Sequence, residues 1–169
     1  TAYVAANNYG LQIINLSTSL SNTLLGSYDS VGRSRGVAIS NDENTVFLTD
    51  TGSGLLIIDI SSPVVPTLVG TFSIPDAGAV TMNHDGTTAY IASGYTVFMV
   101  DVSVLSEPVL LDSQSASGPV QGMAISEDGA VLYVAAGGNV GKLKIFDVNL
   151  APVSINLNTQ GINENDDGA

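Results

Sequence analysis

The sequence has no cysteine and no tryptophan, and its 169 residues include one histidine and four basic side chains. Without cysteine the protein has no disulfide, no thiolate metal site and no thiol nucleophile. Acidic residues number 16, and the resulting net charge of −12 makes nucleic acid and acidic membrane surfaces poor partners. No apolar run reaches the roughly 20 residues that a membrane-spanning helix needs, because the longest one is interrupted by Asp101.

Apolar residues make up 44% of the chain and charged residues 12%, which is the reverse of the balance found in disordered proteins. The length is enough for one domain with a sizeable core or for one compact array of repeats. The chain begins with Thr1 rather than methionine, so we expect a processed product or a piece of a longer protein.

Four kinds of short segment recur along the chain in the same order. One kind is an apolar run closed by Asn or Asp, and it appears as YGLQIINLS, GLLIIDISS, YTVFMVDVS and GKLKIFDVN. A second kind precedes it as TAYVAA, TVFLTD, TAYIAS and VLYVAA, and a third as GVAIS, AVTMN, GMAIS and GINEN. A weaker fourth kind comprises TLLGSY, TLVGTF, VLLDSQ and VSINLN. The chain is therefore built of repeated units of about 40–45 residues.

Each unit is expected to be one sheet of four antiparallel strands. Its segments are rich in Val, Ile, Leu, Tyr and Thr and are separated by Gly, Asn, Asp and Ser, which is typical of short strands and tight turns. This pattern predicts a single all-β domain over 1–169, a β-propeller of four blades with four strands each. A plain β-sandwich is the alternative. The predicted units are 161–169 plus 1–30, then 31–74, 75–117 and 118–160.

The segment GLLIIDISSPVVPTLVGTF resembles the LVIVD repeat, in which a strand ending in Asp leads through Ser-x-Pro to a strand with Leu-Val-Gly. SEDGAVLYVAA and NHDGTTAYIAS are similar to the related YVTN-type propeller repeats. The first unit departs from the pattern, because Asn15 stands in place of Asp and STSLSN lacks the prolines. The resemblance implies a propeller fold and an extracellular, secreted or cell-surface setting in a prokaryote, but it implies no single activity.

The two ends of the chain match each other in sequence. Joining them gives GINENDDGATAYVAA, which aligns without a gap with the intact unit GMAISEDGAVLYVAA. We therefore expect the C-terminal strand to complete the N-terminal blade and close a four-bladed ring, which removes an exposed sheet edge. Two alternatives stay open: the strand could complete the blade of a neighbouring copy, or the chain could be half of an eight-bladed ring.

One face of such a propeller gathers the loops between blades and the loops that join second and third strands. Tyr and Asn on such loops suit sugars or peptides, and two arginines could bind a carboxylate. The alternatives are ordinary loop solvation and pairing of Arg with Asp within the domain. The candidate ligand-binding residues are Arg33, Arg35, Tyr9, Tyr95, Asp50, Asp76 and Gln121, with Asn7, Asn8 and Lys142 beside them.

The opposite face gathers the first hairpins, which are rich in carboxylates. Oxygen ligands suit Ca²⁺, and NENDDG matches part of a calcium-loop pattern, although Asp-Gly is also ordinary turn chemistry. The candidate metal ligands are Asn163, Asn165, Asp167, Asp128, Asp85 and Asp42. No other cofactor is indicated.

No residue pattern indicates catalysis. His84 lies in a predicted hairpin without a nucleophile or an oxyanion hole, so it is not expected to belong to a catalytic triad. The side chains that close the apolar runs, Asn15, Asp59, Asp101 and Asp147, recur once per unit, so each is expected to accept backbone N–H groups of its own turn.

The sequence therefore predicts a non-enzymatic surface module for structural or protein-interaction roles, with protein partners that include copies of itself through blade edges or the terminal strand. A ligand- or sugar-binding propeller domain, or a fragment of a larger propeller protein such as a hydrolase or lyase, is the alternative.

Overall fold

The repeated apolar runs form strands, as expected from their β-branched and aromatic side chains. A computed structural model describes residues 1–17, 22–137, 142–148 and 154–155, and the regular structure in this part of the chain consists of strands. No helix in the described residues is long and apolar enough to cross a membrane.

The strands form four antiparallel sheets, in each of which neighbouring strands pair in chain order. Sheet 1 contains β1 (Ala2–Ala5), β2 (Leu11–Asn15) and β3 (Thr23–Tyr28). Sheet 2 contains β4 (Ser34–Ile39), β5 (Thr45–Asp50), β6 (Gly54–Asp59) and β7 (Thr67–Phe72). Sheet 3 contains β8 (Ala77–Met82), β9 (Thr88–Ser93), β10 (Thr96–Asp101) and β11 (Val109–Ser115). Sheet 4 contains β12 (Val120–Ile125), β13 (Val131–Ala136), β14 (Lys142–Asp147) and β15 (Ser154–Ile155).

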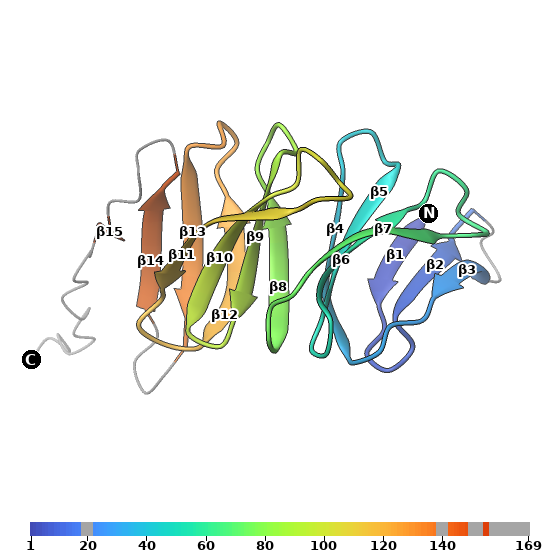
Figure 1. Ribbon diagram of the computed structural model, residues 1–169, viewed down its shortest axis with the longest axis horizontal. Helices are drawn as coiled ribbons and strands as arrows, with labels where there is room; N and C mark the ends of the chain where they lie inside the picture. Colours follow the sequence, from blue (N-terminus) through green and yellow to red (C-terminus); the bar gives the residue numbers. More distant parts are fainter. Residues whose placement is uncertain (18–21, 138–141, 149–153, 156–169) are drawn as a thin grey trace, which may run out of the picture.

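The four sheets stand side by side in a row, with sheet 1 at one end and sheet 4 at the other (Figure 1). Each pair of neighbouring sheets encloses its own apolar core. The core between sheets 1 and 2 is centred on Leu11, Ile13 and Leu48. Phe47 and Ile91 lie in the core between sheets 2 and 3. A third core, between sheets 3 and 4, is built around Tyr90, Leu132 and Val134. The fold is therefore a stack of sheets rather than a two-sheet sandwich.

The closing strand of the expected ring falls on residues 161–169, which lie outside the described residues. Sheet 1 has three strands in the described part of the chain, and β1 forms its edge. In the described residues the three cores join only consecutive sheets, and sheets 1 and 4 lie at opposite ends of the row (Figure 1).

The glycine of the Leu-Val-Gly motif allows the outer strand of one sheet to touch the next sheet. Gly70 on β7 lies against the backbone of the β10–β11 connection, and a Cβ at this position would stand 2.0 Å from the carbonyl oxygen of Leu105. Likewise, a Cβ added to Gly26 on β3 would stand 2.2 Å from the carbonyl oxygen of Pro63. Asp112 occupies the corresponding place on β11, opposite Met99. At the junctions of sheets 1 and 2 and of sheets 2 and 3, the motif glycine thus allows close backbone contact.

Gly70→Ala is expected to destabilise the protein by about 1–3 kcal/mol, because the added methyl group must displace backbone atoms. Gly122→Ala is the matched control, since a Cβ there meets nothing within 4 Å. Urea unfolding of both variants measures the difference. Equal midpoints would show that the β10–β11 connection moves aside without cost.

Candidate functional site

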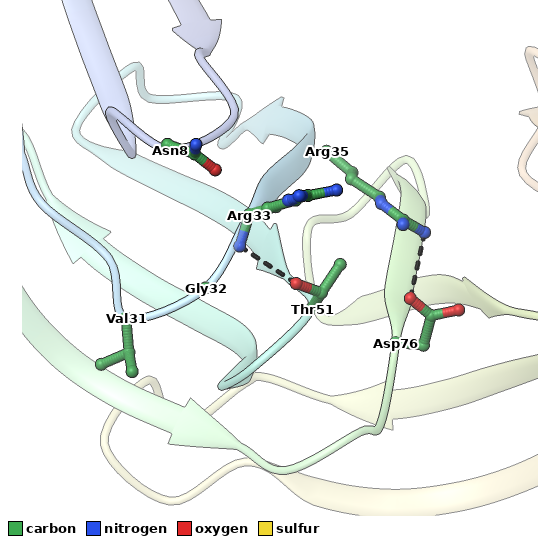
Figure 2. A pocket seen from close by; sticks show the side chains of 7 residues that line it. All are labelled: Asn8, Val31, Gly32, Arg33, Arg35, Thr51 and Asp76. Carbon is green, nitrogen blue, oxygen red and sulfur yellow. Dashed lines mark hydrogen bonds and ion pairs between the residues drawn. The ribbon is translucent and has the colours of Figure 1, made fainter.

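Four loops meet on the loop face of sheets 1–3 and line a pocket with a volume of about 440 Å³. They are the β1–β2, β3–β4, β5–β6 and β7–β8 connections, as expected for the loop face of stacked blades. The residues that line the pocket are Asn8, Val31, Gly32, Arg33, Arg35, Thr51 and Asp76 (Figure 2). The structure therefore brings Arg33, Arg35 and Asp76 together, three of the residues predicted from the sequence.

Asp50 lies beside this pocket and is completely buried. Its carboxylate accepts hydrogen bonds from the Ser30 hydroxyl at 2.8 Å and from the Gly32 amide at 3.1 Å. It also accepts bonds from the amides of Gly52 and Ser53, both at 2.9 Å. The carboxylate thus ties the β3–β4 loop to the β5–β6 loop, and it holds the backbone on which Arg33 sits.

The pKa of Asp50 reflects two opposing effects. Burial raises it, but the hydrogen bonds from Ser30, Gly52 and Ser53 together outweigh burial and hold it below its ordinary value. The side chain is therefore charged at neutral pH, and its charge is satisfied by the loops.

The backbone around Arg33 is held on both sides. The Arg33 amide donates to the Thr51 hydroxyl at 3.0 Å, and the Thr51 amide donates to the Arg33 carbonyl at 3.1 Å. Ser34 pairs with Asn7 through two backbone hydrogen bonds, which join β4 to the β1–β2 loop. The segment around the start of β4, which carries the two arginines, is thus bonded to both the β1–β2 loop and the β5–β6 loop.

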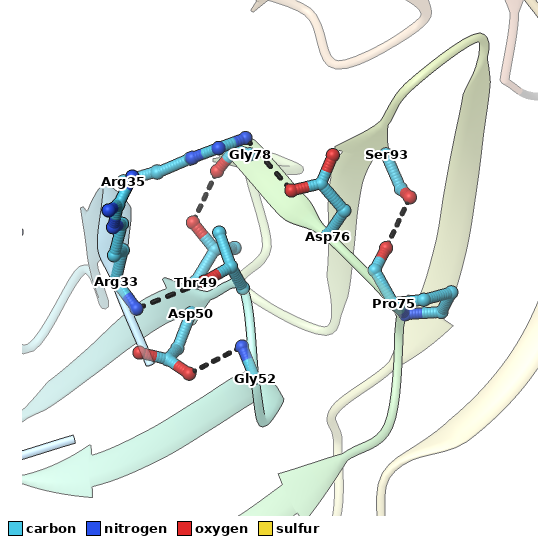
Figure 3. Close-up of polar contacts among 10 residues, drawn as sticks. Arg33, Arg35, Thr49, Asp50, Gly52, Pro75, Asp76, Gly78 and Ser93 are labelled. Atoms are coloured by element: carbon cyan, nitrogen blue, oxygen red, sulfur yellow. Dashed lines mark hydrogen bonds and ion pairs between the residues drawn. The ribbon is translucent and has the colours of Figure 1, made fainter. Parts of the chain in front are cut away.

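Arg35 is placed by a β-bulge at the start of β4. Ser34 pairs with Asp50 and Gly36 with Thr49, so Arg35 has no partner on β5. A bulge changes the direction of the side chain that it carries, and here the Arg35 guanidinium reaches Asp76 at 3.1 Å (Figure 3). Gln121 occupies the equivalent bulge at the start of β12.

The remaining sequence candidates lie elsewhere on the loops. Tyr9 is 75% exposed and Tyr95 is 61% exposed, and neither lines this pocket. Gln121 is exposed on sheet 4, away from the pocket lining. Thr51 does line the pocket, and its place in the DTGSG loop directly after Asp50 is the signal that could have identified it.

The candidate metal ligands in the described residues belong to hairpin turns. Asp42 accepts from the Ser40 hydroxyl at 2.5 Å, Asp85 from the Thr87 hydroxyl at 2.5 Å and Asp128 from the Ser126 hydroxyl at 2.6 Å. These bonds lower the pKa of each carboxylate.

Within the described ranges no group of three or more acidic or histidine side chains could hold a metal ion. Asn163, Asn165 and Asp167 lie outside those ranges, so calcium binding stays a prediction.

The residues that close the apolar runs have the expected turn role in three units. Asn15 accepts the Ser17 amide at 2.9 Å, while Asp59 and Asp101 accept the Ser61 and Ser103 amides at 2.8 Å. His84 lies in the β8–β9 hairpin, and its carbonyl oxygen accepts a 2.6 Å bond from the Asn41 side chain of the neighbouring hairpin.

The LVIVD repeat model matches the chain at residues 2–30, 31–73 and 85–114, which together are more than half of its length. The chain belongs to the LVIVD repeat family. This agrees with the resemblance seen in the sequence. Among curated proteins, none matches this LVIVD repeat chain.

Solved structures show that the LVIVD repeat chain has a β-propeller fold. It is similar to hydrazine synthase of Kuenenia stuttgartiensis, with a TM-score of 0.71 and 15% identity over 83% of this chain and 40% of that one. It is also similar to the periplasmic gluconolactonase PpgL of Pseudomonas aeruginosa, with a TM-score of 0.71 and 17% identity over 86% and 49%.

The β-propeller domain of Cps50 (Swd1) from Myceliophteria thermophila gives a TM-score of 0.66 and 12% identity over 85% and 51%. The LVIVD repeat chain thus spans about half the length of the structures that it matches. Identities this low establish the fold and leave the activity open.

The Asp50 carboxylate is expected to stabilise the protein above pH 4 and to lose that contribution in acid. Its pKa in the folded state lies below the value of about 3.9 for an unfolded chain, so its stabilisation is complete above that value and disappears as the pH falls through the folded pKa. Asp50→Asn removes the charge and should lower the free energy of unfolding by about 2 kcal/mol at pH 7.

The check is urea unfolding of the wild type and Asp50→Asn at neutral pH and in steps below pH 4. The two should converge as the pH falls. A gap that stays constant across this range would contradict the assigned role, and Glu107→Gln, at an exposed position in the β10–β11 connection, serves as the charge-matched control.

Proposed function

We propose that this chain is a non-enzymatic β-propeller module with a structural and protein-interaction role, which assembles head to tail with copies of itself. One observation carries the proposal. In the described part of the chain, the two outermost sheet faces have no neighbouring sheet, and they match the two sides of the interface that recurs three times between consecutive sheets.

The internal interface has two distinct faces. The forward face of each sheet carries an aromatic side chain toward the following sheet: Phe47 on sheet 2 is 1% exposed and Tyr90 on sheet 3 is 3% exposed. The rear face carries an aliphatic residue one position later in the strand, which packs on the preceding sheet. Leu48, Ile91 and Val134 occupy this rear position, and all three are completely buried.

The forward face of sheet 4 has no following sheet in the described part of the chain. Tyr133, which is equivalent to Phe47 and Tyr90, is 39% exposed there. Leu143 on β14 pairs with Ala135, which lies two positions after Tyr133 on β13. Leu143 is 49% exposed, whereas its equivalent Leu55 on sheet 2 is completely buried. Exposed apolar side chains therefore lie on the side of sheet 4 that in sheets 2 and 3 is covered by the following sheet, and such patches often mark interaction sites.

The rear face of sheet 1 is open in the same way. Val4 holds the position of Leu48, Ile91 and Val134, but it is 38% exposed. Ile14 on β2 lies on the same side of the sheet and is partly exposed. The forward face of one chain therefore complements the rear face of another, because the same residue types pair at each internal interface.

A second copy of this chain is the partner that we propose for these faces. Burying a large apolar side chain stabilises an interface by roughly 1.5–3 kcal/mol, so covering the exposed parts of Tyr133, Leu143 and Val4 favours association. The contact is heterologous, so it forms a ring if the rotation between copies closes. Two copies would supply eight sheets, at the upper end of common propeller sizes.

Closure of the ring is proposed between copies. A four-bladed ring completed within one chain by residues 161–169 would make sheets 1 and 4 neighbours, whereas these sheets lie at opposite ends of the row (Figure 1). The segment GINEN has the sequence of a first strand. In a head-to-tail pair it follows sheet 4 of one copy and can add to the open edge of β1 in the other copy.

An extracellular or cell-surface setting in a prokaryote is part of the proposal. The net charge of −12 supports it, because it favours solubility at high salt outside the cell.

Light scattering should show the wild-type chain as a dimer or a larger assembly. Val4→Asp removes the rear face and Tyr133→Asp removes the forward face, so each variant alone should be monomeric. Each places a charge in the apolar contact, which costs several kcal/mol when it is buried without a partner. Leu68→Asp is the control, since Leu68 is 44% exposed on the outer strand β7 and touches neither face.

Mixing Val4→Asp with Tyr133→Asp tests the polarity of the contact. Each variant keeps one intact face, so the mixture should form a dimer and nothing larger. A monomeric wild type, or variants that do not restore pairing when mixed, would overturn the head-to-tail assembly.

A further inference from the structure

We propose that the pocket around Arg33 and Arg35 binds a small organic carboxylate that also carries hydroxyl groups. This site is separate from the assembly faces, because it lies on the loop end of sheets 1–3.

The charge distribution points to this pocket. The whole chain has four basic residues against 16 acidic ones, and both of its arginines line the same cavity. Arginine presents a planar fork of donors that matches a carboxylate with two parallel hydrogen bonds. The chain is strongly acidic, yet both of its arginines lie in this one pocket. An anion is therefore expected to bind at this pocket.

The two arginines differ in their partners. Arg35 is paired with Asp76 at 3.1 Å, with both side chains about half exposed or more. Arg33 is exposed, and in the described residues its guanidinium forms no ion pair, although its backbone is fully bonded. Figures 2 and 3 both show the Arg33 guanidinium beside the side chain of Arg35. The Arg33 guanidinium is therefore available to donate hydrogen bonds to a ligand, and Arg35 places a second positive charge next to it.

The scaffold under Arg33 is ordered before any ligand arrives. Asp50 fixes the Gly32 amide, Thr51 bonds the Arg33 backbone on both of its polar groups, and Ser34 is joined to Asn7. The Asp50 charge is taken up by four loop groups and is buried, so it does not occupy Arg33. Such preorganisation lowers the cost of ordering a site on binding.

The rest of the lining favours a hydroxylated ligand. Asn8, Thr51 and Asp76 offer amide, hydroxyl and carboxylate groups around the two arginines, and these groups suit sugar-like hydroxyls. Val31 is the apolar lining residue, and it is 94% exposed, so the pocket lacks the apolar slot that a peptide side chain would fill. A sugar acid fits this combination better than a peptide terminus does.

The test uses the ¹H–¹⁵N spectrum of the full chain during titration with sodium D-glucuronate. We expect shifts in the amide signals of Gly32 and Thr51 and in the Arg33 Nε signal. The dissociation constant should lie in the millimolar range, and added salt should weaken binding. Arg33→Gln should weaken binding about tenfold or more, since it removes a charge-assisted bidentate contact. Lys144→Gln is the charge-matched control outside the pocket and should bind like the wild type.

Two further probes separate the parts of the ligand. Glucose, which lacks the carboxylate, should leave the three signals in place, and acetate, which lacks the hydroxyls, should bind more weakly than glucuronate. Unmoved signals at Gly32 and Thr51, or equal affinity in Arg33→Gln and the wild type, would overturn the site, and equal affinity for acetate and glucuronate would overturn the hydroxylated class. Repeating the titration on monomeric Tyr133→Asp keeps the result independent of assembly.

Discussion

The arrangement of the sheets in this protein follows from one requirement, which is that both apolar faces of a sheet must be buried. The third strands carry apolar residues on consecutive positions, as in GLLIID, so neither face of such a sheet can be left in water. Stacking the sheets resolves this for sheets 2 and 3, whose central strands are buried on both sides. Among the described residues, the two outermost faces carry the same kind of apolar side chains, such as Val4 and Tyr133, without a neighbouring sheet over them, and the proposed assembly rests on this exposure.

Polar contacts between neighbouring sheets fix how the sheets stack. The Thr49 hydroxyl donates to the carbonyl oxygen of Gly78 on the next sheet, and the Asn41 side chain reaches the neighbouring hairpin at His84. Both contacts join sheet 2 to sheet 3. The apolar core between these two sheets supplies the attraction, and the two polar contacts help to fix their relative position.

The pocket on the loop face forms because stacking brings the loops of neighbouring sheets together. Its arginines lie on the β3–β4 loop and at the start of β4, while its other polar groups come from the loops of sheets 1, 2 and 3. The buried carboxylate of Asp50 joins two of these loops, so the rigidity of the site and the stability of the fold depend on the same side chain. In a repeat protein, sequence changes in the loops can change function without changing the apolar cores.

The sequence by itself determined the strand segments, the turn role of Asp59 and Asp101, and the repeat family, because these depend on short-range patterns that recur in every unit. The arginines and Asp76 could also be placed on one face from the repeat register. Only the tertiary structure decided that Asp50 is buried, that Arg35 sits on a bulge and that the four sheets of the described residues lie in a row. Burial, bulges and the angle between sheets depend on contacts between residues far apart in the chain, which no local pattern encodes.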